Sequence, residues 1–248
     1  MAGPTGLLLD YHGVISDIER FRREWSRLLG DFLSQRFGST PEIWREANRS
    51  ARQRAASRAR TREANRATNG QEQPSRNERI DWLRDVLVLA GSGVPDEDEL
   101  HTTAIEVLRY VTRNTQSAVP AAATTLRILH ERGFRLFTAS GDDSVNLSNY
   151  LSALGVRELF EQTYGADLLG VRKDGPAFYA TLLARESLDA ARVIVVDDDA
   201  HRLDWARALG MNTLLVGQKD ASSSHPRVQQ FAELPSALGS GRFRSPAV

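Results

Sequence analysis

Short apolar runs alternate with helical segments over the second half of the chain, and this alternation limits the possible folds more than any other feature. The runs at 134–139, 192–196 and 212–216 have the length and apolar content of buried strands, and amphipathic segments separate them. Strands that alternate with helices in this way are typical of a parallel sheet. We therefore predict an α/β fold with a doubly wound parallel sheet, in which 164–169 forms a further short strand.

The first half of the chain has a different pattern. One short strand at 6–10 is followed by residues 17–115, in which apolar side chains recur every three or four residues and no convincing strand occurs. This spacing predicts a series of amphipathic helices. We therefore predict a core domain made of residues 1–16 and 116–248, with an all-helical domain, 17–115, inserted after the first strand.

Composition excludes several classes of protein. Hydrophobic residues make up 41% of the chain and charged residues 26%, close to the globular average, so wholesale disorder is excluded. No apolar run reaches the ~18 residues of a membrane-spanning helix, and the N-terminal residues lack the basic segment of a secretory signal. The chain contains no cysteine, and therefore neither a disulfide nor a thiolate metal site. We expect a cytoplasmic protein without a membrane partner.

Positive charge is concentrated in one part of the predicted helical domain. The chain carries 32 basic and 32 acidic residues, yet ten arginines lie between Arg45 and Arg79, where only four glutamates oppose them. The segment is either a solvated helix face or a surface that attracts an anionic ligand. Aromatic side chains do not interleave with these arginines, which argues against nucleic-acid binding. We predict no nucleic-acid partner.

Polar side chains occur next to the predicted carboxyl ends of the core strands, the edge at which open parallel sheets bind ligands. These side chains are Asp10, Ser140, Lys173 and the three aspartates Asp197, Asp198 and Asp199. A single Asp or Ser at such a position is more often a helix cap or a turn residue. Three successive aspartates, however, repel one another unless a cation or base lies nearby, and Mg²⁺ is a cation that prefers carboxylate oxygens.

Carboxylates, a lysine and a hydroxyl around Mg²⁺ form a site suited to phosphoryl transfer. The carboxylate of the first strand can attack phosphorus and form an aspartyl-phosphate. The metal and the lysine neutralise charge on the transferring group, and the hydroxyl donates a hydrogen bond to it. Phospho-receiver domains use similar residues, but there the acidic pair precedes the acceptor aspartate, so the order in this chain argues against a receiver.

Four segments of the predicted core carry sequence motifs. One hydrophobic strand ends in Asp10-Tyr-His-Gly-Val14, a second ends in Ser140, Gly170–Phe178 contains Lys173, and Val193–Met211 contains the three aspartates. In order and spacing these segments resemble the four motifs of the haloacid dehalogenase superfamily. A helical insertion directly after the first motif is similar to the C1-type cap of that superfamily, and residues 17–115 fit it.

The resemblance implies a role for each residue. Asp10 is the expected nucleophile, and Ser140 and Lys173 are expected to bind the transferring group. The expected cofactor is Mg²⁺. Its expected ligands are Asp10, the backbone carbonyl of His12, Asp198 and Asp197, with help from Asp199.

The chain departs from the superfamily pattern at three positions. His12 replaces the aspartate that acts as general acid/base, Arg202 replaces the last aspartate of the fourth motif, and Asp174 replaces a proline. Histidine donates and accepts protons near neutral pH, because its unperturbed pKa is about 6.5. A cationic ring beside Mg²⁺ is nevertheless unfavourable. His12 is therefore a substituted acid/base, a substrate contact, or a sign of lost catalysis.

These observations predict a Mg²⁺-dependent phosphatase that acts on a small phosphorylated metabolite. The main alternative is a catalytically degenerate binding or regulatory protein of the same fold. A 2-haloacid dehalogenase is a weaker alternative, because without a cation the acidic cluster would repel the carboxylate of the substrate. The predicted cap contains no lysine, which excludes the Schiff-base chemistry of some superfamily members. The sequence specifies neither the substrate nor the oligomeric state.

Overall fold

The computed structural model describes residues 6–66, 76–217 and 223–239 of the chain. The chain divides into two compact units, one made of Met1–Phe21 with Gln116–Val248 and the other of Arg22–Thr115. All strands of the described residues belong to the first unit. Helix α1 (Ile18–Phe37) begins in the first unit and continues into the second.

The first unit is built on a six-stranded parallel sheet with the strand order β3-β2-β1-β4-β5-β6. The strands are β1 (Gly6–Leu9), β2 (Arg135–Ala139), β3 (Phe160–Tyr164), β4 (Val193–Asp197), β5 (Asn212–Val216) and β6 (Arg227–Val228). β1 lies between β2 and β4, so that Leu7 is in register with Leu136 on one side and Ile194 on the other. The strand order reverses at β1, and the prediction of a doubly wound parallel sheet is confirmed.

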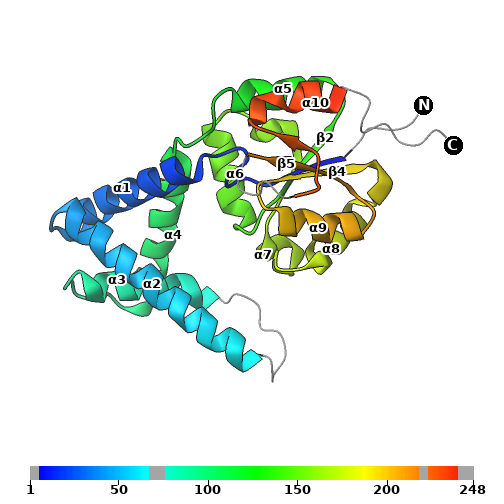
Figure 1. Cartoon of the computed structure of the whole chain (residues 1–248). Coiled ribbons are helices and arrows are strands. Elements are labelled where there is room, and N and C mark those ends of the chain that lie inside the picture. The colour runs from blue at the N-terminus through cyan, green and yellow to red at the C-terminus, as the bar shows by residue number, and fades with distance from the viewer. Residues whose placement is uncertain (1–5, 67–75, 218–222, 240–248) are drawn as a thin grey trace. The chain divides into compact units, whose positions relative to one another are not determined.

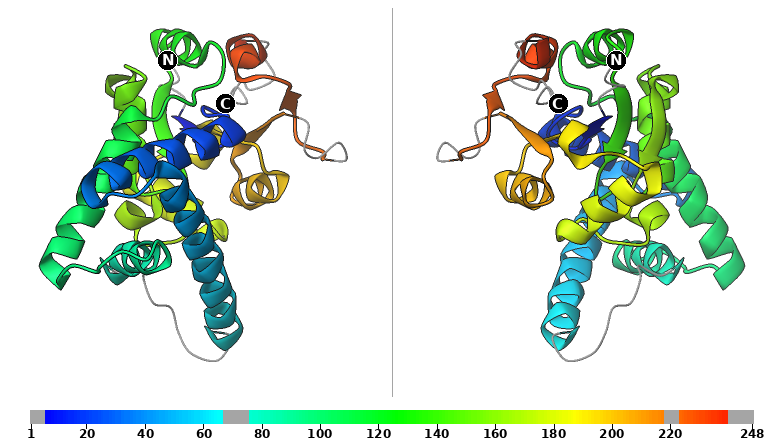
Figure 2. Two further views of the ribbon diagram at one scale, coloured as in Figure 1. Left: turned by 90° about the vertical axis from the view of Figure 1, so that its left-hand side faces the viewer. Right: turned by 90° about the vertical axis from the view of Figure 1, so that its right-hand side faces the viewer.

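Helices cover both faces of this sheet, as Figures 1 and 2 show. Successive side chains of a strand point to opposite faces. Leu7 and Leu9 therefore belong to one buried cluster and Leu8 to another. The first cluster includes α5 (Ala122–Glu131), α6 (Ser144–Ala153) and α10 (Leu234–Gly239), and the second includes α7 (Ala166–Leu169), α8 (Pro176–Glu186) and α9 (Ala200–Ala208). Burial on both faces explains why β1 is a continuous apolar run.

The second unit has a helical core of its own. Its helices are the greater part of α1, then α2 (Pro41–Arg66), α3 (Arg76–Leu89) and α4 (Glu97–Asn114). Trp44 is fully buried in this core and donates its indole N–H to the carbonyl of Gly38 at 2.7 Å. Asp96 caps α4, because its side chain accepts the backbone N–H of Glu99 at 2.9 Å. No helix in the described ranges combines the length and the apolar character that a membrane crossing needs.

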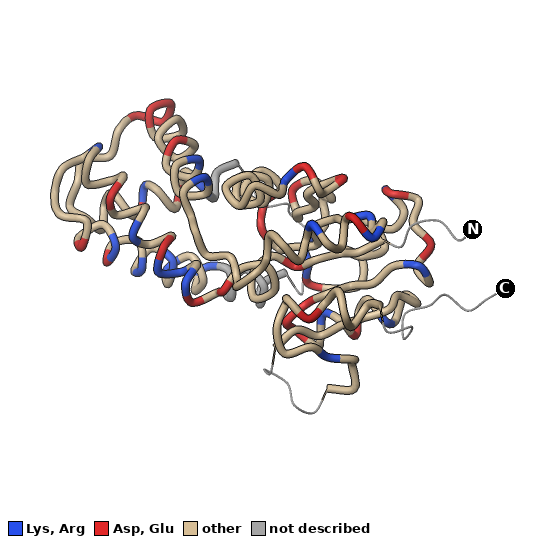
Figure 3. The backbone as a smooth tube through the Cα atoms, turned by 90° about the horizontal axis from the view of Figure 1, so that it is seen from above, with Lys and Arg blue, Asp and Glu red and all other residues tan. Residues whose placement is uncertain are grey.

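Several arginines of the second unit form ion pairs with its own carboxylates. The pairs in the arginine-rich segment are Arg45–Glu42, Arg49–Glu46 and Arg58–Asp85. The guanidinium of Arg52 lies 6.0 Å from the ring centroid of Trp25. Figure 3 shows both basic and acidic residues along the backbone of the chain. These contacts are typical of a solvated helix face; the side chains of 59–78 lie outside the described part.

Two parts of the core differ from the sequence prediction. The predicted strand at 164–169 is wrong, because Tyr164 ends β3 and Ala166–Leu169 forms the short helix α7. An apolar run this short fits both a helix and a strand, while β3 is an edge strand whose exposed side chains mask its pattern. The sequence also gives no prediction of β6 or α10. The sequence further predicts a helix break at 70–74, from its glycine and proline, and a loose tail at 241–248; both segments lie outside the described residues.

Candidate active site

A pocket of about 510 Å³ opens at the carboxyl end of the sheet in the first unit. Ligands of doubly wound sheets bind at this edge, next to the point where the strand order reverses. Five of the predicted site residues line the pocket, namely Asp10, His12, Ser140, Asp198 and Asp199. Ser140 directly follows β2 and is 1% exposed. Lys173 and Asp197 are also buried and contact Asp10 or each other, so the structure brings all the predicted residues to one place.

The turn after β1 fixes the position of Asp10. The residue is 2% exposed, and its N–H donates to the carbonyl of Val196 at 3.0 Å. The N–H of Tyr11 donates to Asp10 Oδ1 at 2.8 Å. Gly13 follows with a φ of +87°, and a Cβ atom at this position would lie 2.2 Å from Asp198 Oδ2. Only glycine therefore combines this backbone conformation with the close approach of Asp198.

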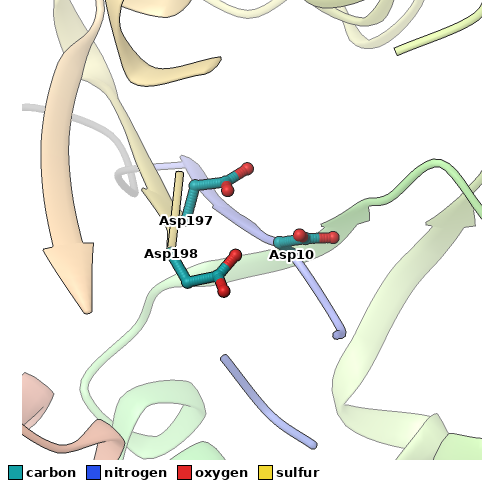
Figure 4. Close-up of side chains that lie close together, drawn as sticks. All are labelled: Asp10, Asp197 and Asp198. Carbon is teal, nitrogen blue, oxygen red and sulfur yellow. The ribbon is translucent and has the colours of Figure 1, made fainter. Parts of the chain in front are cut away.

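Three carboxylates converge at the ends of the two central strands, as Figure 4 shows. Asp10 follows β1, Asp197 ends β4, and Asp198 comes next in the chain. One oxygen from each carboxylate lies within 4.8 Å of the other two. Burial raises the pKa of Asp197 to about 6. The negative charge of Asp10 adds to this rise, and the positive charge of Lys173 opposes it. The three carboxylates are thus close enough to repel one another, and nearby cations must balance their negative charge.

Lys173 is the first of these cations. Its Nζ lies 2.7 Å from Asp197 Oδ2 and 3.4 Å from Asp10 Oδ1, and it donates to the carbonyl of Ala139 at 2.5 Å. Burial alone would lower the pKa of Lys173, but Asp10 and Asp197 raise it above its ordinary value, so the amine stays charged. Lys173 does not follow a strand, as the sequence suggested, but lies in the loop between α7 and α8.

Arg202 is the second cation, although the sequence marks it only as the replacement of an acidic residue. It lies in the first turn of α9, which Asp199 caps by accepting the N–H of His201 at 2.9 Å. Its guanidinium lies 3.2 Å from Asp10 Oδ2, 4.0 Å from Asp197 Oδ1 and 3.6 Å from Asp199 Oδ2. Arg202 therefore adds a positive charge where the superfamily pattern has a negative one.

His12 lies against the pocket wall and is held by Asp142, a residue to which no sequence motif pointed. His12 Nε2 lies 3.2 Å from Asp142 Oδ2, while Nδ1 is buried without a hydrogen-bond partner among the described residues. The ring centroid of Phe21 lies 4.3 Å from that of His12. Burial would raise the pKa of Asp142, but the hydrogen bond and the charge from His12, with a hydrogen bond from Asn146, lower it. The only sequence signal for Asp142 is its place two residues after Ser140.

Tyr179 is a further buried polar residue near the cluster that the sequence did not indicate. Its hydroxyl has no hydrogen-bond partner among the described residues. Burial raises its pKa, while the charge of Lys173 opposes the rise. Tyr179 stands six positions after Lys173, on α8. The phenol is therefore neutral at physiological pH, and it is enclosed by the protein and not part of the pocket lining.

The donor set of the cluster suits a hard divalent cation. Mg²⁺ prefers one or two carboxylates together with water or phosphate oxygens, and Asp10, Asp197 and Asp198 offer such oxygens in one place. The cluster includes Asp10, Asp197 and Asp198 from the set predicted by the sequence. The carbonyl of His12 and the assisting role of Asp199 stay predictions.

The sequence matches a family model described as haloacid dehalogenase-like hydrolase over residues 5–210. Over 151 residues it is 26% identical to the haloacid dehalogenase-like hydrolase domain-containing protein 3 of Mus musculus, across 59% of each chain. Over 129 residues it is 27% identical to "Probable phosphatase IndB" of Dickeya dadantii (strain 3937), across 50% of this chain and 56% of the relative. The matches thus span less than two thirds of the length of either relative.

Among solved structures, a defluorinating L-2-haloacid dehalogenase matches with a TM-score of 0.66, across 95% of each chain and at 15% sequence identity. Identity this low shows a shared fold and no more. One relative is named as a phosphatase and this fold neighbour as a dehalogenase. The comparisons therefore support a hydrolase and leave the class of substrate open.

Proposed function

The chain belongs to the haloacid dehalogenase-like hydrolases, and from this premise we propose that it is a Mg²⁺-dependent phosphatase acting on a small phosphorylated metabolite. One observation carries the proposal, namely the convergence of Asp10, Asp197 and Asp198 at the carboxyl end of the sheet. A nucleophilic carboxylate beside two further carboxylates that can hold a metal is an arrangement suited to phosphoryl transfer.

In the first proposed step, Asp10 Oδ2 attacks the phosphorus of the substrate while the bond from phosphorus to the leaving oxygen breaks. The leaving oxygen takes a proton from His12, which gives a free alcohol and a phosphoryl group bound to Asp10. Asp10 Oδ1 is already held by the N–H of Tyr11 at 2.8 Å and by Lys173 at 3.4 Å. These contacts orient the carboxylate and leave Oδ2 on the side of Arg202.

In the second step, water loses a proton to His12 and attacks phosphorus, and the bond between phosphorus and Asp10 breaks. The products are inorganic phosphate, the original carboxylate and a protonated His12 ready for the next cycle. Asp142 engages Nε2 of His12, and the other ring nitrogen, Nδ1, is buried without a hydrogen-bond partner among the described residues. A carboxylate that holds one ring nitrogen in this way fixes the tautomer and the orientation of the ring.

Other residues hold the transferring group. Mg²⁺, which Asp10, Asp198 and the His12 carbonyl would hold with Asp197 beside them, supplies positive charge to the phosphoryl oxygens when bound. Lys173 pairs with both Asp10 and Asp197 from the buried side of the cluster. Ser140, which lines the pocket at the end of β2, donates its hydroxyl to a phosphoryl oxygen.

The proposal is tested by measuring phosphate release from a panel of phosphorylated metabolites in the presence of MgCl₂. The native chain should turn over at least one of them, and Asp10→Asn should abolish turnover because an amide cannot form the aspartyl-phosphate. Equal rates of phosphate release for the native chain and Asp10→Asn would contradict the proposed phosphatase activity. Asp96→Asn is the matched control: asparagine caps a helix as well as aspartate does, so this variant should keep native turnover.

A metal-independent 2-haloacid dehalogenase is a second candidate, and one observation favours it. Lys173 and Arg202 already balance Asp10 and Asp197 with positive charge, so the acidic cluster repels the carboxylate of a haloacid less than expected from the aspartates alone. In this reaction Asp10 attacks the carbon that carries the halogen, halide leaves, and water cleaves the resulting ester to give a 2-hydroxy acid. Halide release from 2-chloropropionate in the presence of EDTA, lost in Asp10→Asn, would favour this activity over phosphatase.

The same two assays address the third class, a catalytically degenerate protein. Absence of both phosphate and halide release, in a chain that still binds an anionic ligand in the pocket, would identify a binding module. Isothermal titration with inorganic phosphate measures such binding directly.

A further inference from the structure

Both carboxylates at the centre of the site already have every oxygen in contact with a donor. Asp10 Oδ1 meets the N–H of Tyr11 and Lys173, and Asp10 Oδ2 meets Arg202. Asp197 Oδ2 meets Lys173, and Asp197 Oδ1 accepts the N–H of Asp199 at 3.0 Å with Arg202 at 4.0 Å. A divalent cation that binds these oxygens therefore meets two positive side chains rather than an empty anionic site.

We propose that Arg202 is a resident cation of this site that competes with Mg²⁺ for Asp10 and Asp197. The inference rests on the use of Mg²⁺ in the proposed function. It concerns the affinity of the site for metal and not the chemistry that follows.

Arg202, and not Lys173, is the cation that can make room. The side chain of Lys173 is 2% exposed and donates to a backbone carbonyl as well as to Asp197, so moving it would leave a buried charge unpaired. The side chain of Arg202 is 34% exposed and enters the cluster from the first turn of α9. Withdrawal of Arg202 toward solvent costs less than withdrawal of Lys173, because ion pairs of a partly exposed side chain contribute little to stability.

Asp199 gives the displaced guanidinium a second partner. Its Oδ2 already lies 3.6 Å from Arg202 Nε, and its side chain is 47% exposed. Arg202 can therefore release Asp10 Oδ2 and keep an ion pair at the mouth of the pocket. The site then has two states that differ by a short movement of the Arg202 side chain. In one, Arg202 balances Asp10; in the other, Asp10 is free to bind metal.

The position of Arg202 in the sequence strengthens the argument. Position 202 is where the fourth motif carries an aspartate, so the chain differs there by two units of charge. Like charges a few ångströms apart oppose each other strongly in a partly buried site. The expected result is weak binding of Mg²⁺ by the native chain, and much stronger binding once the guanidinium is removed.

The test is isothermal titration of EDTA-treated protein with MgCl₂ at pH 8. Arg202→Gln should bind Mg²⁺ at least about tenfold more tightly than the native chain, because it removes the competing charge and keeps a side chain of similar length. Arg207→Gln on the same helix is the matched control, since Arg207 pairs with Asp204 at 2.6 Å and does not line the pocket. Its affinity should equal that of the native chain. Affinities of the native chain and Arg202→Gln within twofold of each other, or weaker binding by the variant, would overturn the proposal.

Two further measurements keep the result independent of folding and of activity. Arg202→Met, checked like Arg202→Gln by circular dichroism, should show the same gain in affinity if the glutamine variant does not fold. In the native chain, the NMR signal of Arg202 Nε–H should move on addition of MgCl₂ and not of an equal ionic strength of NaCl; a signal that stays in place while Mg²⁺ binds contradicts competition. Tighter binding of Mg²⁺ by Arg202→Gln in a chain without phosphatase activity would support this inference and reject the proposed function.

Discussion

At the level of single residues, the carboxylate of Asp10 meets two cations and a backbone N–H within 3.4 Å. The same carboxylate is the proposed nucleophile, so its charge is stabilised before any ligand arrives. A nucleophile held this firmly loses little orientational freedom in the reaction. The proton transfers of the proposed reaction therefore depend on His12 and Asp142 rather than on Asp10 itself.

His12→Ala is expected to lower turnover of the preferred phosphomonoester by about 10² to 10⁴-fold, because it removes the general acid and base. Steady-state kinetics at saturating MgCl₂ measure the effect. His130→Ala, at an exposed histidine of α5, is the control and should retain native turnover. Higher activity in His12→Asp would show that the native histidine is a weakened catalyst, and native turnover in His12→Ala would exclude it as the proton carrier.

Gly13→Ala is expected to cost about 1 to 3 kcal/mol of folding free energy through its positive φ, and also to weaken Mg²⁺ binding, since the new Cβ displaces Asp198. Gly133→Ala is the matched control: it has a φ of +84° but no atom within 4 Å of the added Cβ. The control should lose folding stability but keep the native affinity for Mg²⁺. Urea unfolding and Mg²⁺ titration separate the two effects, and equal Mg²⁺ affinities in the two variants would contradict the role of Gly13.

The sequence predicted some of these residues and missed others for identifiable reasons. Asp10, Ser140 and Asp198 follow buried strands, and the ends of parallel strands meet at one edge of a sheet, so their proximity could be predicted. The contacts of Asp142 with His12 and of Arg202 with Asp10 join residues 130 and 192 positions apart. Such contacts depend on the turn after each strand, whose side-chain directions no local pattern specifies.

At the level of elements, long periodic segments were predicted well and short ones were not. The 20 residues of α1 repeat an apolar spacing over several turns, which no strand can satisfy. The four residues of α7 complete a single turn, so Ala166–Leu169 carries no periodicity to distinguish helix from strand. Lys173 was consequently assigned to the end of a strand, although its place in the site was predicted correctly from the motif order.

The cap of α4 gives a prediction at this scale. Asp96→Ala should lower the free energy of unfolding by about 1 kcal/mol, because the N–H of Glu99 loses its side-chain acceptor at the start of the helix. Asp96→Asn should lose much less, since asparagine offers an oxygen at the same place. Urea unfolding followed by circular dichroism measures both variants, and equal losses would mean that the charge rather than the hydrogen bond stabilises α4.

At the level of the whole molecule, hydrogen bonds within the first unit join the segment that precedes the helical insertion to the segment that follows it. The N–H of Asp17 donates to the carbonyl of Ser117 at 2.8 Å, and the hydroxyl of Ser117 donates to that of Ser16 at 3.2 Å. The three buried hydrophobic clusters also divide by unit: two consist of residues of the first unit and one of residues of the second. Each unit therefore has the apolar core that independent folding needs.

A chain in which residues 22–115 are replaced by a linker of roughly six glycines and serines is expected to fold, because so short a segment is enough to rejoin neighbouring ends. Dispersed amide NMR signals and a cooperative urea transition would show a folded first unit. A collapsed or aggregated product would show that the helical unit is needed for folding of the sheet.

The central place of β1 in the sheet has a consequence for how the protein is made. β1 leaves the ribosome before both of its neighbours, since β2 begins at Arg135 and β4 at Val193. At a synthesis rate of roughly 5 to 20 residues per second, Gly6–Leu9 waits on the order of ten to forty seconds for its second neighbour. During that interval an apolar strand with two open edges is exposed to other nascent chains, and a chaperone that shields it until β4 emerges would raise the yield of native protein.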